Sequence, residues 1–130
     1  MIGLDTNVLV RFLVQDDRTQ FERAQKLIKS EARTHGVFIS LLVLLETEWV
    51  LRSRYGLLKN DFIRVLSELL ESADLQIEDE PSVEVALFWW KDSRAEFADC
   101  LISARHRALG CRATASFDVK ATKVPGFVAL

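Results

Sequence analysis

Cysteine and histidine are scarce in this sequence, which limits the kinds of metal and catalytic site that it can form. Only two cysteines (Cys100, Cys111) and two histidines (His35, His106) occur among 130 residues, and no CxxC pair or Cys/His cluster is present. Zinc sites are built from such clusters, so zinc is not expected. The histidines lie far apart in the sequence and give little support to Ser-His-Asp or Cys-His catalysis. We expect both cysteines to be reduced and buried.

Long hydrophobic runs are absent as well. The longest, residues 39–45, is interrupted by Ser40 and falls short of the roughly 18 residues that a membrane helix requires. Residues 1–5 contain no basic segment followed by an apolar one, so no export signal is expected. We therefore predict a cytoplasmic protein that does not associate with membranes.

Glycine and proline are few, and the composition is that of a folded domain. The chain has five glycines and two prolines, with 49% hydrophobic and 28% charged residues. This composition excludes a disordered or fibrous chain. A length of 130 residues allows one domain with its own core. We expect a single domain over residues 1–130.

The charge balance is slightly acidic, with a formal net charge of −2. Proteins that bind nucleic acids usually carry a basic face. If four carboxylates are gathered in one metal site, however, the rest of the chain carries a net charge of +2. The net charge therefore argues only weakly against a nucleic-acid ligand.

Short apolar segments alternate with longer segments of helical periodicity. Strands are expected at residues 2–4, 37–40, 75–77, 112–116 and 127–130. Helices are expected after the first strand, at 19–32 and 41–54, after an N-cap at Asn60, and at 81–91 and 97–109. Residues 124–127 have the composition of a type II turn. The alternation predicts an α/β domain in which helices cover both faces of a parallel sheet.

Acidic residues recur where the expected strands end, which is where sites form in open parallel sheets. Asp5 follows the first strand, and Asp118 follows the strand at 112–116. Glu46 lies on the helix after the second strand, and Asp99 lies in the first turn of its helix. Carboxylates that are brought together repel one another unless a cation neutralises them. Oxygen ligands select Mg²⁺ or Mn²⁺, ions that typically promote hydrolysis of phosphodiesters.

Most of these acids also have an ordinary structural explanation. Asp5 could cap the helix that follows, although Thr6 could do so instead. Asp99 near a helix N-terminus favours the helix dipole. Asp118 could form an Asx turn in its loop. Taken singly, these explanations are at least as good as metal binding, and only the set of acids calls for a shared role.

Two glutamates compete for the place on the helix at 41–54. Glu46 could be a solvated helical residue, but it follows five apolar residues and lies one turn from Val43 and Val50. Glu48 fits the solvated explanation better. Spacing alone does not separate the two.

Four blocks of sequence resemble PIN domains, and more closely the VapC-type toxins of bacterial toxin–antitoxin systems. They occur in the family order and span nearly the whole chain. The blocks are LDTNVL at 4–9, IS at 39–40 with LLE at 44–46, FADCLI at 97–102 and SFD at 116–118.

The resemblance implies a set of metal ligands and two polar residues beside them. The family glutamate corresponds to Glu46 and not to Glu48, and Ser116 stands where threonine is more common. Asn7 and Ser116 match the small polar positions that orient the carboxylates. The acid at Asp118 corresponds to the position that varies most in the family. The residues implied to bind one or two Mg²⁺ or Mn²⁺ ions are Asp5, Glu46, Asp99 and Asp118.

The resemblance also implies a fold, an activity and partners. The fold is a PIN-like three-layer α/β domain with a short central parallel sheet. The activity is that of a selective endoribonuclease, a toxin whose cognate antitoxin covers the active site and which forms a homodimer. The aromatic run at 88–90 could contact these partners, although burial explains it equally well. Arg11, Arg52 and Arg54 could bind RNA phosphates or remain solvated.

Two other classes of protein are rivals to this interpretation. The first is a non-catalytic PIN-like module that binds RNA or protein, against which the retention of all four acids argues. The second is a phosphate-handling α/β protein. An aspartyl-phosphate phosphatase needs an Asp where this chain has Asn7, and a receiver domain needs an early acidic pair that is missing here.

Overall fold

Three short strands among residues 1–78 pair into a parallel sheet. In the computed structural model, β2 (Val37–Ile39) lies between β1 (Ile2–Gly3) and β3 (Leu75–Ile77), and both pairs are parallel. The pairing continues beyond β1, because the backbone N–H of Leu4 donates to the carbonyl of Phe38 at 3.0 Å. Parallel pairing brings the carboxyl ends of the three strands to one edge of the sheet.

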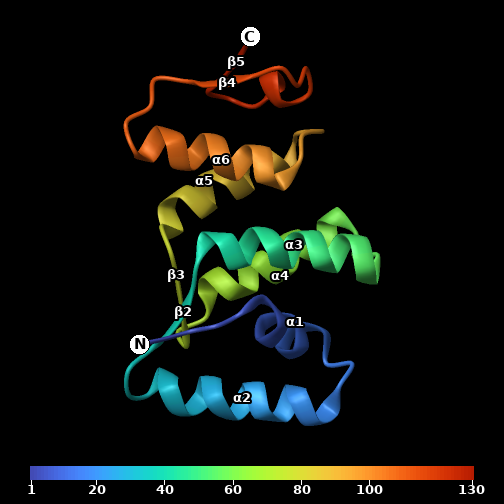
Figure 1. The fold of residues 1–130 in the computed structure, drawn as a ribbon, viewed down its shortest axis with the longest axis vertical. Helices are drawn as coiled ribbons and strands as arrows, with labels where there is room; N and C mark the ends of the chain where they lie inside the picture. The colour runs from blue at the N-terminus through green and yellow to red at the C-terminus, as the bar shows by residue number, and fades with distance from the viewer. The chain divides into compact units, whose positions relative to one another are not determined.

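The chain divides into two compact units. The structure describes all residues, 1–130, and the first unit comprises residues 1–78 and the second residues 79–130. Figure 1 traces the succession of helices and strands from the N-terminus to the C-terminus. Each unit has its own parallel sheet and its own buried apolar residues. The expectation of a single domain over 1–130 stays a prediction.

Four helices belong to the first unit: α1 (Thr6–Val14), α2 (Arg18–Ala32), α3 (Leu41–Tyr55) and α4 (Lys59–Glu71). α1 packs against both α2 and α3, while α4 contacts α3 and β3. Apolar residues at helical spacing form the buried side of these helices. They include Leu9, Val10, Ala24, Ile28, Leu44, Leu51, Phe62 and Leu66.

Small polar residues determine where two of these helices begin. Asp17 is the N-cap of α2, and its carboxylate accepts the backbone N–H of Gln20 at 3.0 Å. Ser40 is the N-cap of α3, and its Oγ accepts the backbone N–H of Val43 at 3.2 Å. Such bonds satisfy backbone donors that have no partner within the helix. α3 ends at Gly56, whose φ of +65° suits a residue without Cβ.

The second unit combines two helices with a pair of strands. α5 (Glu80–Lys91) and α6 (Phe97–Ala108) pack against each other. β4 (Thr114–Ser116) pairs in parallel with β5 (Phe127–Ala129), and the short 3₁₀ helix η1 (Ala121–Lys123) lies between them in sequence. The unit therefore repeats, on a smaller scale, the helix-and-parallel-strand organisation of the first.

Aromatic packing joins α5 to α6. The ring of Trp90 lies against Phe97 with the centroids 5.2 Å apart, and its Nε1–H donates to the carbonyl of Ala95 at 3.2 Å. Trp90 is 5% exposed, whereas Phe88 is 73% exposed. The aromatic run at 88–90 is thus divided between the core and the surface, as two-residue separation on a helix requires.

The predicted type II turn forms at residues 124–127. Gly126 has a φ of +88°, and the backbone N–H of Phe127 donates to the carbonyl of Val124 at 3.2 Å. Both features define this turn type. The turn is anchored to α6, because the hydroxyl of Ser103 donates to the carbonyl of Pro125 at 2.6 Å.

The predicted α/β class is confirmed, since six helices occur together with strands that pair in parallel throughout. Most predicted bounds agree with the observed ones to within two residues. None of the helices combines the length and the apolar character that crossing a membrane requires.

Two local predictions are wrong. Asn60 does not cap α4, because the backbone N–H groups of Asp61 and Phe62 already bond to the carbonyl of Leu58 at 3.0 Å, so the helix begins before Asn60. Cys111 is exposed, since it follows the end of α6 in a loop, whereas Cys100 is buried as expected.

Candidate active site

The first candidate acid, Asp5, lies at the carboxyl edge of the three-stranded sheet. It follows β1 and occupies the N-cap position of α1 in an extended conformation, with φ −76° and ψ 158°. Its side chain forms no capping hydrogen bond and is exposed. Thr6, the alternative cap, is instead the first helical residue and is buried. Helix capping therefore does not account for the carboxylate of Asp5.

α3 exposes one glutamate and buries the other. Glu46 is exposed, whereas Glu48 is 5% exposed and accepts hydrogen bonds from Nε of Arg52 at 3.2 and 3.3 Å. The expectation that Glu48 is the solvated glutamate is wrong. A buried carboxylate needs a charged partner, and Arg52 supplies one from the next turn of the same helix. Glu48 and Arg52 therefore form an ion pair within α3.

Glu78 is an acid at the same sheet edge that sequence reasoning missed. It directly follows β3, and its Oε1 accepts the backbone N–H of Leu41 at 2.9 Å. This bond holds the first turn of α3, the helix that carries Glu46. The signal was present in the sequence, because Glu78 follows the strand predicted at 75–77 just as Asp5 follows the first strand.

Asn7 lies in the first turn of α1 beside a hollow of about 420 Å³ that is lined by residues of α1 and α2. Arg11 and Arg23 line the same hollow. Arg11 is held in place by a bond to Asp16 at 3.0 Å and by a bond to Tyr55 at 2.9 Å. The exposed amide of Asn7 thus faces solvent near a fixed guanidinium.

In the second unit, Asp99 occupies the first turn of α6 and is half-buried. Burial raises the pKa of this carboxyl above its ordinary value. A hydrogen bond from the backbone N–H of Glu96 lowers the pKa, and the negative charges of Asp118 and Glu96 raise it further. The bond to Glu96, the N-cap residue, gives Asp99 a structural role at the start of the helix.

Asp118 lies in the loop after β4 and is exposed. Its Oδ1 accepts the backbone N–H of Lys120 at 2.9 Å, which forms the Asx turn that its sequence context allowed. The hydroxyl of Ser116 accepts the backbone N–H of Asp118 at 2.9 Å. Ser116 therefore fixes the loop backbone from which the Asp118 carboxylate projects.

The four candidate acids are divided equally between the two units. The first unit contributes Asp5 and Glu46, and the second contributes Asp99 and Asp118. In the second unit the two carboxylates interact electrostatically, since the charge of Asp118 raises the pKa of Asp99. Neither unit alone gathers three His, Cys, Asp or Glu side chains into a group that could hold a metal ion.

Comparison with known families covers both units. The sequence model of the PIN domain matches residues 2–126, nearly the entire chain. This chain belongs to the PIN domain family. The PIN domain therefore extends over the strands, helices and all four candidate acids described above, and the predicted PIN-like α/β fold is confirmed.

A relative of this PIN domain is named as a ribonuclease. The protein is similar to the VapC ribonuclease of Aquifex aeolicus (strain VF5), with 23% identity over 121 residues. The aligned region is 93% of this chain and 90% of the relative. The family and the relative together support the predicted nuclease class.

Proposed function

We propose that this PIN domain is a metal-dependent endoribonuclease and the toxin of a toxin–antitoxin pair. The observation that carries the proposal is the match to the PIN domain over residues 2–126, together with similarity to a VapC ribonuclease over 93% of the chain. The proposed reaction is hydrolysis of RNA phosphodiester bonds, in the cytoplasm.

The proposed metal ligands are Asp5, Glu46, Asp99 and Asp118, and the proposed ion is Mg²⁺ or Mn²⁺. The donor set fits such an ion, because it consists entirely of carboxylate oxygens. Burial, and to a smaller extent the charge of Asp118, raises the pKa of Asp99, and a cation beside these carboxylates would favour their ionised form. When bound, an ion of this kind supplies an activated water and offsets charge on the departing oxygen.

The remaining polar residues of the proposed site have positioning roles. Ser116 holds the backbone of Asp118, and Glu78 holds the first turn of α3, which carries Glu46. The Asx turn uses only Oδ1 of Asp118, so Oδ2 is free to bind a ligand. Asn7 is proposed to orient the carboxylate of Asp5 when the ion is bound.

The proposed partners are a cognate antitoxin, whose tail would cover the acids, and a second copy of the chain. The relative's name places it among VapC ribonucleases, and this supports both partners by analogy. Purification of the protein together with the product of the adjacent reading frame would test the antitoxin. Light scattering of the purified chain would test the homodimer.

Substitution of single carboxylates tests the nuclease proposal. Asp5→Asn and Asp99→Asn should each abolish Mn²⁺-dependent RNA cleavage and weaken Mn²⁺ binding measured by calorimetry, while circular dichroism remains that of the wild type. Each change removes one negative charge and one strong oxygen ligand but preserves side-chain shape.

Exposed acids elsewhere provide matched controls. Asp74→Asn in the first unit and Glu84→Gln in the second remove the same charge far from the proposed ligands in sequence, and both variants should cleave normally. If Asp5→Asn and Asp99→Asn cleave RNA at the wild-type rate, the ligand assignment is wrong. A wild-type protein that binds RNA without binding Mn²⁺ would instead be a non-catalytic PIN-like module.

A further inference from the structure

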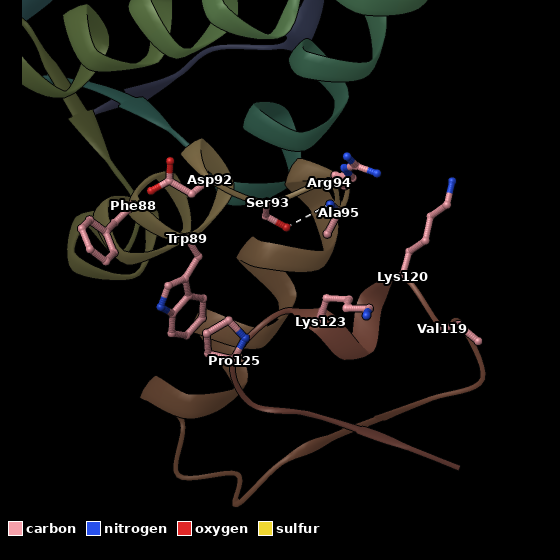
Figure 2. Close-up of a pocket in the computed structure, with 10 residues that line it drawn as sticks. All are labelled: Phe88, Trp89, Asp92, Ser93, Arg94, Ala95, Val119, Lys120, Lys123 and Pro125. Atoms are coloured by element: carbon pink, nitrogen blue, oxygen red, sulfur yellow. Dashed lines mark hydrogen bonds between the residues drawn. The ribbon is translucent and has the colours of Figure 1, made fainter.

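A hollow of about 770 Å³ lies entirely within the second unit and has no role in the site described so far. Two segments form its walls. One is the end of α5 with the loop that leads into α6, and the other is the segment around η1 and the 124–127 turn (Figure 2). We call it the α5–η1 hollow.

Aromatic surface forms one side of the α5–η1 hollow. Trp89 is half-buried and lies next to Pro125 in Figure 2, and Phe88 is 73% exposed at the edge. Trp90, in contrast, is buried and packs against Phe97 in the core. Val119, which is 74% exposed, lines the same hollow, so exposed apolar side chains occur on both of its walls. A flat ring beside solvent also offers a platform on which another flat ring can stack.

Three cations border the same hollow: Arg94, Lys120 and Lys123. All three are exposed, and none forms an ion pair with a carboxylate. Asp92 is the single acid in the lining. The hollow is therefore locally positive although the whole chain carries −2. Unpaired cations beside an aromatic wall fit an anionic ligand that also has flat apolar rings.

The α5–η1 hollow shares its loops with two of the candidate metal ligands. Lys120 lies two residues after Asp118, and its backbone N–H bonds to the Asp118 carboxylate at 2.9 Å. Ala95, in the other wall, lies four residues before Asp99. A ligand in the hollow would therefore lie on the loops that present these carboxylates.

We infer that the α5–η1 hollow binds an unpaired segment of RNA next to the phosphate that is cut. A base stacks on Trp89, and Lys120 and Lys123 contact the flanking phosphates. The inference rests on the proposed nuclease function and assigns a substrate subsite to it. Stacking on a ring requires a base that is not in a duplex, so the hollow selects single-stranded RNA.

Binding of a fluorescein-labelled, single-stranded RNA oligonucleotide tests the subsite. Fluorescence anisotropy is measured on the full chain carrying Asp99→Asn, so that the oligonucleotide stays intact. In this background Trp89→Leu should weaken binding by about 5- to 100-fold, the usual effect of removing one base stack. Trp89→Phe, which keeps a smaller ring, should restore part of the affinity.

The two lysines provide a second measurement that does not depend on the packing of Trp89. Both are exposed, so Lys120→Gln with Lys123→Gln should leave the fold intact. The double variant should reduce the slope of log K against log salt by about 0.7 for each phosphate that a lysine no longer neutralises. Lys91→Gln with Lys29→Gln is the matched control, because both lysines are exposed and neither borders the hollow. This control should leave the slope unchanged.

Three results would overturn the inference. The first is an unchanged affinity and salt slope in both the Trp89→Leu and the double-lysine variants. The second is equal affinity for the oligonucleotide and for its duplex. The third is a loss of dimerisation in Trp89→Leu with unchanged RNA affinity, which would assign the face to a second copy of the chain.

Failure of the subsite is distinguishable from failure of the nuclease proposal. If wild-type protein with Mn²⁺ cleaves RNA and the variants of the hollow cleave it with an unchanged KM, only the subsite is wrong. If the wild type cleaves no RNA but the variants weaken its binding, the nuclease proposal fails and the RNA site remains.

Discussion

At the residue scale, the carboxylates of this protein fall into two groups according to their partners. Glu48 and Asp79 each pair with an arginine, and Asp79 also accepts hydrogen bonds at the start of α5, so their charges stabilise the fold. Asp5 and Glu46 are exposed, and no such role accounts for them. The charges of the first group stabilise the fold, whereas a bound ligand would account for those of the second group.

Asp79 illustrates the first group and leads to a prediction about pH. It is the N-cap of α5, its Oδ2 accepts the hydroxyl of Ser82 at 2.6 Å, and Arg105 donates to the same oxygen at 2.8 Å. The bond from Ser82 and then the bond and charge of Arg105 lower the pKa of Asp79, although burial opposes them. A lowered folded-state pKa contributes stability above the ordinary pKa of about 3.9, and this contribution is lost as the pH falls through the folded-state pKa.

We therefore expect Asp79→Asn to lower the free energy of unfolding at pH 7 by about 1–2 kcal/mol. Asn is chosen because residue 79 has a φ of +49°, which Asn tolerates and Ala does not. Urea unfolding of wild type and variant between pH 7 and pH 2 measures the difference, which should shrink as the pH falls below 4. A difference that stays constant over this range would show that the charge of Asp79 does not contribute.

At the scale of elements, short connections place the candidate residues. The Asx turn at Asp118 and the bond from Ser116 direct the loop after β4, and the 124–127 turn returns the chain to β5. The turn depends on Gly126, because a Cβ there would lie 2.5 Å from Oγ of Ser103. The same Ser103 hydroxyl holds the carbonyl of Pro125. The turn in one wall of the α5–η1 hollow thus requires glycine at position 126.

Two glycine substitutions separate backbone strain from steric conflict. Gly110→Ala places a side chain at a φ of +93° with no atom within 4 Å, so it should cost about 1 kcal/mol. Gly126→Ala adds the contact with Ser103 and should cost about 1–3 kcal/mol more. Thermal unfolding of both variants measures the difference. Equal decreases in stability would show that Ser103 moves aside without cost.

At the scale of the whole molecule, the proposed site draws two ligands from each unit. The proposed site is therefore tested by the stability of the complete chain with and without the metal ion. A ligand that binds only the folded protein stabilises it by RT ln(1 + [L]/Kd), about 2.7 kcal/mol at one hundred times Kd. The match to the PIN domain extends over residues 2–126 and so includes residues of both units.

We expect Mn²⁺ to raise the Tm of the wild-type protein and EDTA to reverse the increase. The increase should be abolished in Asp5→Asn and equally in Asp99→Asn, because each unit supplies ligands to the same proposed ion. Glu84→Gln should retain it. If Asp5→Asn retains the full increase while Asp99→Asn does not, the ion is held by the second unit alone.

Local signals predicted most of the elements but not the burial of their polar residues. The strand at 75–77 and the turn at 124–127 were predicted with their observed bounds, because β-branched residues, glycine and proline act through the backbone nearby. α3 is different, since residues 41–45 are all apolar and define no single buried face. Spacing therefore could not show that Glu48 is buried and Glu46 exposed.

By itself, the sequence determined the α/β class, the PIN resemblance and the identity of the four candidate acids, because these depend on local periodicity and on the order of motifs. The tertiary structure decided which acids already have partners, as it did for Glu48 with Arg52 and for Asp79 with Arg105. It also decided that Phe88 is exposed while Trp90 is buried, and that Lys120 and Lys123 border the same hollow. The physical reason is that burial, and pairs such as Asp79 with Arg105, depend on contacts between segments distant in sequence. The pair of Glu48 with Arg52 is local, and only the burial of Glu48 depends on such contacts.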